Sequence, residues 1–191
     1  MPFTEANFEN AIIEIFRDML GYEYLYGPDV VRDFSEPLCV DILEDALVRI
    51  NPSLPRPAID EAIARIKSLE SGSLARKNAH FTDMLQNGVA VNYFDGSEQR
   101  AGLVRLVDYD LPMRNRFTVA NQWTVEERSV RRADIVVFVN GLPLVVVELK
   151  SPSREATDVS EAYAQLRNYM QEIPSLFVYN AFCVMSDLWL L

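Results

Sequence analysis

The chain has 191 residues, of which 49% are hydrophobic and 24% charged, and its formal net charge is −10 at pH 7. This length suits one large domain with a substantial core, and the composition is that of an ordinary globular protein. No apolar run approaches the roughly 18 to 20 residues that span a bilayer, and the N-terminus lacks the segments of a signal peptide. We therefore expect a cytoplasmic protein with no membrane partner.

Residues suited to zinc or redox chemistry are scarce. Cys39 and Cys183 are far apart and lie in apolar surroundings, which is typical of buried free thiols in a reducing compartment rather than of a disulfide or a metal site. His80 is the only histidine and cannot build a zinc site by itself. Metal chemistry would therefore have to use oxygen ligands.

The first half of the chain is predominantly helical in pattern. Thr4 is a plausible N-cap, apolar residues follow at helical spacing, and Gly21 suits the end of this first helix. "YEYLYG" alternates like a short strand. Residues 36–86 then predict three helices in a row, interrupted by prolines and by Gly72 and ended by Gly88.

The second half predicts consecutive strands at residues 88–94, 101–109, 116–125, 133–140 and 142–149, in the manner of a meander. A helix is expected from Asp158 to Glu172, and residues 176–185 are expected to form a last buried strand. We predict a single α/β domain over residues 1–191, with residues 36–86 as a helical insertion and residues 88–191 as the sheet-rich core.

Three charged residues flank the apolar hairpin "ADIVVFVNGLPLVVVELK". Alternation along a strand places Glu148 and Lys150 on one face of the second strand, and Asp134 lies at the start of the first. One interpretation is that these are solvated ions where the strands leave the core. The other is that Asp134 and Glu148 hold Mg2+, with the Leu149 carbonyl as a further oxygen ligand and Lys150 assisting a water molecule or the transition state.

The connection between these strands tests the second interpretation. A plain two-residue turn at Asn140-Gly141 would pair Val139 with the residue after the turn and leave Asp134 facing away from Glu148. For both carboxylates to share a face, one extra residue is required. We therefore predict a three-residue loop or a β-bulge near Asp134.

Asp134 followed by "ELK" resembles the PD-(D/E)xK nuclease signature, with Ala133 where a proline is often found. The segments "VNGLPLVVVELKSP", "QLRNYMQEIPSLFVYN" and "NQWTVEERSVRRADIVVFVNG" are similar to the N-terminal nuclease domain of the restriction (R) subunit of type I restriction-modification enzymes. The resemblance runs over nearly the whole chain. It implies a PD-(D/E)xK core, in which a mixed central sheet is flanked by helices and a helical insertion follows the first helix and strand, and it implies Mg2+-dependent hydrolysis of DNA phosphodiester bonds.

The resemblance also implies roles for further residues. The family's additional motif matches Gln165 and Tyr169, which would support the active site from one helix face. The alternative from the residues alone is a core tyrosine and a surface glutamine. Related nucleases often place one more acid on the first helix, where Glu9 is the candidate, although a solvated helix acid explains it as well.

The negative net charge of the chain argues against nucleic-acid binding, because phosphates are bound by cationic side chains. Arg128, Arg131 and Arg132 nevertheless cluster just before Asp134, and we predict that they meet the DNA backbone without reading its sequence. The family implies double-stranded DNA, a modification subunit and a specificity subunit as partners. Its ATP-driven motor has no counterpart here, because no Walker A motif occurs, so we expect a fragment of a longer R subunit that does not itself bind ATP.

Two alternatives to this nuclease domain remain from the sequence. One is a stand-alone repair or junction-resolving nuclease on the same core, against which the long helical segment argues. The other is a non-catalytic module that docks a motor onto its methyltransferase. The complete Asp134, Glu148 and Lys150 set argues against the second alternative, since a docking surface does not need it.

Overall fold

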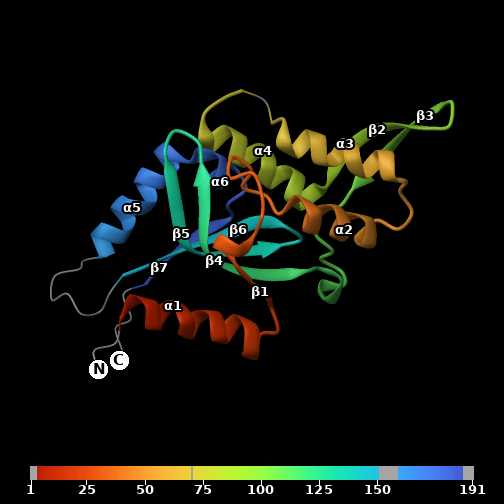
Figure 1. Ribbon diagram of the computed structural model, residues 1–191. Helices are drawn as coiled ribbons and strands as arrows, with labels where there is room; N and C mark the ends of the chain where they lie inside the picture. The colour runs from red at the N-terminus through yellow and green to blue at the C-terminus, as the bar shows by residue number, and fades with distance from the viewer. Residues whose placement is uncertain (1–3, 70, 151–158, 187–191) are drawn as a thin grey trace. The chain divides into compact units, whose positions relative to one another are not determined.

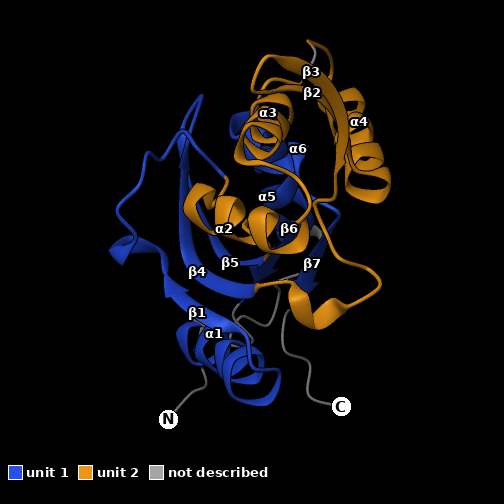
Figure 2. Cartoon of the chain, turned by 90° about the vertical axis from the view of Figure 1, so that its right-hand side faces the viewer, with its two compact units in different colours: residues 1–37, 117–138, 143–191 blue, residues 38–116, 139–142 orange. Residues whose placement is uncertain are grey.

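The computed structural model describes residues 4–69, 71–150 and 159–186 (Figure 1). The chain divides into two compact units, coloured separately in Figure 2. Unit 1 consists of residues 1–37, 117–138 and 143–191, and unit 2 of residues 38–116 and 139–142. In the described ranges, no helix is both long and apolar enough to cross a membrane.

Unit 1 is built on a five-stranded sheet in the order β1-β4-β5-β6-β7. The strands are β1 (Glu23–Tyr26), β4 (Phe117–Glu126), β5 (Val130–Val139), β6 (Leu142–Leu149) and β7 (Phe182–Ser186). β1 runs parallel to β4 and β6 parallel to β7. The connections between β4, β5 and β6 are too short for parallel neighbours, so these three strands are antiparallel. The predicted α/β fold with a mixed central sheet is confirmed.

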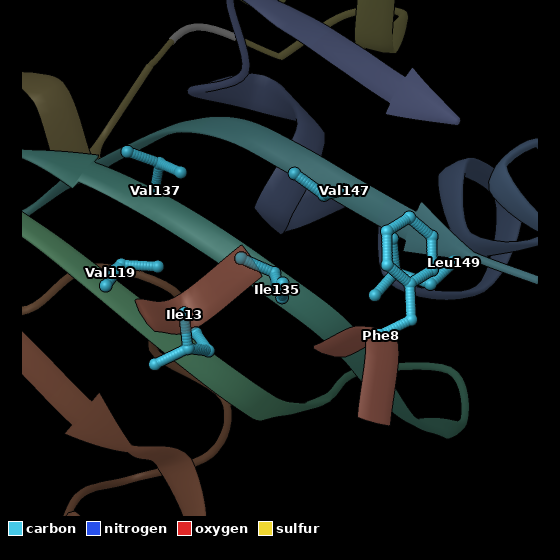
Figure 3. Close-up of a cluster of buried hydrophobic side chains, with 7 residues drawn as sticks. All are labelled: Phe8, Ile13, Val119, Ile135, Val137, Val147 and Leu149. Carbon is cyan, nitrogen blue, oxygen red and sulfur yellow. The ribbon is translucent and has the colours of Figure 1, made fainter. Parts of the chain in front are cut away.

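The first helix, α1 (Glu5–Glu14), covers one face of this sheet. Thr4 caps it as predicted, because its hydroxyl accepts a hydrogen bond from the Asn7 backbone at 3.3 Å. A π-helical segment (Ile15–Met19) extends the helix, and Gly21 ends it with φ of +72°. Its apolar side chains meet those of β4, β5 and β6 in a buried cluster of Phe8, Ile13, Val119, Ile135, Val137, Val147 and Leu149 (Figure 3).

The β5–β6 hairpin turns on two residues only, so the predicted alternative of a three-residue loop is wrong. Asn140 and Gly141 have φ of +52° and +80°, as the type I′ turn requires. The Asn140 side chain holds this conformation from a buried position. Its oxygen accepts from the Arg116 backbone at 2.8 Å, and its amide donates to the Leu106 carbonyl at 2.9 Å.

The faces of the hairpin nevertheless show the predicted one-residue offset. Ile135 and Val137 lie in the same cluster under α1 as Val147 and Leu149 (Figure 3). A regular ladder from a two-residue turn would set these two pairs on opposite faces, because cross-strand partners share a face. A one-residue bulge would account for this offset, and the bulge stays a prediction. Residues 134 and 148 consequently both lie on the face away from α1.

The end of unit 1 differs from its prediction. The helix expected from Asp158 to Glu172 is confirmed as α5 (Val159–Glu172) over the described residues. The apolar run 176–185 is not one buried strand. Its first part belongs to the short helix α6 (Pro174–Val178), and β7 begins only at Phe182 and is partly exposed. A short apolar run does not distinguish a buried helix from a strand, and β7 is an edge strand of the sheet.

Unit 2 contains the three predicted helices, α2 (Val40–Ile50), α3 (Arg56–Lys67) and α4 (Leu74–Asn87). Among the described residues, β2 (Val89–Asp95) and β3 (Glu98–Val104) pair only with each other, so the expected continuous meander is wrong. The strand expected at 101–109 stops at Val104. There the Asn51 side chain bonds both the amide and the carbonyl of Arg105 at 2.9 Å, which replaces a strand partner.

Candidate active site

Three of the predicted residues gather where the C-terminal end of β6 lies beside the middle of β5. Glu148 is buried, with 1% of its surface exposed. The Lys150 Nζ donates a hydrogen bond to Glu148 Oε1 at 2.9 Å. Asp134 Oδ2 accepts from the Leu149 backbone amide at 2.8 Å, which fixes the Asp134 carboxylate beside the strand that carries Glu148. A buried carboxylate is costly unless it is paired, and Lys150 provides that pairing.

Helix α5 brings Gln165 and Tyr169 to the same place. The Lys150 Nζ also donates to Gln165 Oε1 at 2.5 Å, and Gln165 Nε2 donates to the Tyr169 hydroxyl at 2.7 Å. The Tyr169 hydroxyl in turn donates to the Arg132 carbonyl at 3.2 Å. Residues four apart share a helix face, so Gln165 and Tyr169 face Lys150 from the same side of α5. The alternative of a surface glutamine without a specific contact does not fit these bonds.

Tyr169 lies near both carboxylates. Burial raises the pKa of its phenol, and the negative charges of Glu148 and Asp134 add to this effect, so that the pKa is about 12. Tyr169 is 6% exposed. It therefore remains protonated at neutral pH and can donate its hydrogen bond to the Arg132 carbonyl.

The donor set fits a hard divalent cation. Asp134 and Glu148 supply carboxylate oxygens from neighbouring strands on one face of the sheet. Within the described ranges, no three side chains of histidine, cysteine, aspartate or glutamate gather in a group that could hold a metal ion. Two carboxylates, completed by water and substrate oxygens, are the ligands that Mg2+ uses in phosphate chemistry.

Glu9 makes a second polar cluster, of which the sequence indicated only the acid. Its two carboxylate oxygens accept hydrogen bonds of 2.6 Å from the side-chain amides of Asn121 and Gln122 on β4. Gln122 has a left-handed φ of +54°, and Gly27 lies so close that a β-carbon would be 2.5 Å from the Gln122 carbonyl oxygen. The polar pair "NQ" inside an apolar strand was the signal for this cluster.

The predicted DNA-contacting arginines have partners of their own on α5. Arg131 pairs with Glu172 through both carboxylate oxygens, one at 2.7 Å. Arg128 Nη1 donates to the Gln171 carbonyl at 3.0 Å. Arg132 is exposed, and its carbonyl is the acceptor for Tyr169. The DNA contact of these three residues stays a prediction.

A protein-family profile, described as the N terminus of the type I restriction enzyme R protein, matches residues 2–188. The chain belongs to this family. The predicted resemblance to the type I R subunit is thus confirmed, and the chain belongs to a family of restriction-system proteins.

Two relatives show how far the family resemblance extends. The HindI endonuclease subunit of a type I restriction enzyme from Haemophilus influenzae is 40% identical over 178 residues, which cover 88% of this chain and 17% of that subunit. The provisionally named MjaIXP endonuclease subunit from Methanocaldococcus jannaschii is 30% identical over 189 residues, which cover 94% of this chain and 18% of the subunit. The chain spans less than a fifth of the length of these relatives.

Proposed function

We propose that this chain is the metal-dependent DNA endonuclease domain of a type I restriction enzyme R subunit, built on a PD-(D/E)xK core. Asp134 and Glu148 hold Mg2+, and Lys150, Gln165 and Tyr169 complete the catalytic site. The observation that carries the proposal is the position of the Lys150 ammonium, which lies between Glu148 and Gln165 at the strand end where Asp134 is fixed. Relatives named as endonuclease subunits support it and favour it over a stand-alone repair nuclease.

The proposed reaction is hydrolysis of one phosphodiester bond. The oxygen of a water molecule adds to phosphorus, one phosphorus–oxygen ester bond breaks, and the leaving alkoxide receives a proton. Mg2+, when bound, supplies Lewis acidity at a phosphoryl oxygen and lowers the pKa of water. Lys150 stabilises the negative charge that develops on the phosphoryl oxygens and orients the attacking water by donating a hydrogen bond.

Gln165 and Tyr169 keep the lysine in place. Lys150 has four rotatable side-chain bonds, and its salt bridge with Glu148 alone would leave it two protons free to seek other acceptors. Gln165 Oε1 takes one of them, and Tyr169 fixes the amide of Gln165 from its other side. A buried network with each member bonded holds catalytic groups in a single geometry.

DNA and the other subunits enter as proposed partners. With a net charge of −10 the chain has few cations to spare for phosphates, so we propose that DNA affinity comes mainly from other parts of the enzyme. Double-stranded DNA, the modification subunit and the specificity subunit are the partners implied by the family. The ATP-dependent motor is proposed to lie in the remaining length of the R subunit.

Plasmid nicking by the assembled enzyme tests the proposal. Lys150→Ala and Asp134→Asn are introduced into the full R subunit, which is assembled with its partner subunits and given Mg2+ and ATP. Asparagine at position 134 keeps an oxygen for the Leu149 amide, so the hairpin is retained while the charge is lost. Both variants should lose cleavage by at least about a hundredfold, as expected when a charged group acting on the transition state is removed. Lys67→Ala, an exposed lysine at the end of α3, is the matched control.

The outcome separates the nuclease from the docking module. Wild-type cleavage that persists in both variants would refute the catalytic assignment and favour a non-catalytic module. Loss of cleavage with ATP hydrolysis preserved in the same assemblies supports the assignment, because a docking defect would reduce ATP-driven movement as well.

A further inference from the structure

The turn between β4 and β5 is fastened to the C-terminal end of α5. Besides the Arg131–Glu172 ion pair, the Arg128 backbone amide donates to the Glu172 carbonyl at 3.0 Å, and the Arg128 side chain donates to the Gln171 carbonyl. Glu127 Oε2 accepts from the Ser175 amide at 2.9 Å. Two bonds from Arg128 thus join the turn to the end of α5, and both satisfy carbonyls that a helix end leaves without partners. Arg131 on β5 adds the ion pair to the same helix end, and Glu127 bonds the first turn of α6.

These contacts lie on the helix that carries Gln165 and Tyr169. Glu172 follows Tyr169 by three residues and Gln165 by seven, which is about 10 Å along the helix axis at 1.5 Å per residue. An α-helix moves as a rigid rod over this length. A shift of the C-terminal end of α5 therefore moves Gln165 relative to Lys150. The hydrogen bond from Tyr169 to the Arg132 carbonyl would shift too, because Arg132 is the residue after Arg131 on β5.

The pairing also argues against Arg131 as a contact for DNA phosphate. Its Nε and Nη2 groups both bond the Glu172 carboxylate. This pairing takes up the Nε–Nη2 edge of the guanidinium and leaves only the Nη1–Nη2 edge for a phosphate. A phosphate on that edge would lie close to the negative charge of Glu172, which weakens its binding. The pKa of Glu172 is lowered mainly by its hydrogen bond with Arg131, so this carboxylate is ionised at neutral pH.

We propose that the Arg131–Glu172 pair, assisted by Arg128, positions α5 over the active site, so that Arg131 is a positioning residue and not a contact for DNA. The inference rests on the proposed nuclease function of Lys150 and deepens it. The side chains of the pair are 42% and 32% exposed, and exposed ion pairs contribute little to stability. Disruption of the ion pair is therefore expected to slow cleavage without impairing folding.

Glutamate is the decisive half of the pair, because it cannot bind a phosphate. Arg131→Gln and Glu172→Gln are made separately in the full enzyme, and single-turnover cleavage rates are measured beside the dissociation constant for DNA. Both variants should cleave roughly tenfold to a hundredfold more slowly, as for a displaced catalytic group, with DNA affinity within about twofold of wild type at each salt concentration. Arg17→Gln is the matched control, since Arg17 also binds a carboxylate, that of Asp18, through two bonds at 2.7 and 2.8 Å.

Exchange of the two charges gives a rescue test. Arg131→Glu combined with Glu172→Arg restores an ion pair of opposite polarity, and it should recover most of the cleavage rate that either single reversal loses. Weaker DNA binding and a smaller salt dependence in Arg131→Gln, with Glu172→Gln like wild type, would overturn the inference and make Arg131 a phosphate contact. Unchanged rates in both glutamine variants would overturn it too.

Lys150→Ala, measured in the same series, separates this inference from the proposed function. If Lys150→Ala is inactive while the Arg131 and Glu172 variants behave like wild type, the catalytic site stands and only the positioning role fails. If Lys150→Ala cleaves normally, the proposed function itself fails, and the positioning role with it.

Discussion

Replacing Tyr169 with phenylalanine removes one buried hydroxyl from the active-site network. At neutral pH the Gln165 amide loses its acceptor and the Arg132 carbonyl loses its donor. Leaving buried polar groups without partners costs about 1 to 3 kcal/mol. Tyr169→Phe should therefore be less stable than wild type by this amount at pH 8, and the difference should change sharply in alkaline solution.

The alkaline change follows from the raised pKa of Tyr169. In the unfolded chain the phenol loses its proton near its ordinary pKa of 10.0, whereas in the folded chain it does so only near 12. Above pH 10 the unfolded state therefore binds fewer protons than the folded state, and stability falls as the pH rises. Two pKa units correspond to about 2.7 kcal/mol in full, of which about 1.4 kcal/mol is lost by pH 11. Phenylalanine has no such loss.

Urea unfolding of wild type and Tyr169→Phe from pH 8 to pH 11 measures this effect. The stability advantage of wild type should shrink by about 1.4 kcal/mol across the range. Tyr163→Phe, which removes the hydroxyl of an exposed tyrosine on the same helix, is the matched control. An advantage that stays constant to pH 11 would contradict the burial of Tyr169 beside Glu148 and Asp134.

Three further predictions concern the turn, the metal and the thiols. Gly141→Ala should destabilise the protein by about 1 to 3 kcal/mol more than Gly96→Ala in urea unfolding. Both glycines have positive φ, but a β-carbon at Gly141 would lie 2.5 Å from the Cys39 carbonyl oxygen, whereas one at Gly96 would meet open space. Equal losses of stability would argue against this crowding. Mg2+ at about 100 times its dissociation constant should raise the free energy of unfolding of wild type by about 2.7 kcal/mol and should not stabilise Asp134→Asn, so equal stabilisation in calorimetry would place the ion elsewhere. A thiol reagent should label Cys183, which is partly exposed, before the buried Cys39, but more slowly than free cysteine because burial raises the pKa of Cys183; faster labelling of Cys39 in mass spectrometry would contradict this order.

Local signals in the sequence were sufficient for most of the helices. Thr4 and Gly21 mark the ends of the first helical segment through capping and a left-handed backbone, both of which depend on neighbouring residues only. The residue types of Asn140-Gly141 also favour the two-residue turn with positive φ, but the requirement that Asp134 and Glu148 share a face led to the wrong alternative of a three-residue loop. Where the sequence interpretation failed, at 101–109 and 176–185, short apolar runs were the only signal, and a distant side chain or a new helical turn decided the outcome.

The candidate site divides in the same way. The alternation of "VVVELK" already determined that Glu148 and Lys150 share a face, because side chains alternate along any strand. The predicted offset between β5 and β6, which brings Asp134 to that face, became visible only in the shared core cluster under α1. Such a relation depends on which strands pack against which helix, and no local pattern records it.

The sequence by itself thus determined the family, the order of helices and strands up to those two runs, and the acids and lysine proposed for catalysis. Only the tertiary structure gave these residues their partners: Lys150 between Glu148 and Gln165, Glu9 against Asn121 and Gln122, and Arg131 on Glu172, 41 positions away. Propensity and periodicity act over a few residues along the chain. Hydrogen bonds and ion pairs between distant side chains form only after packing has fixed the distance between the elements that carry them.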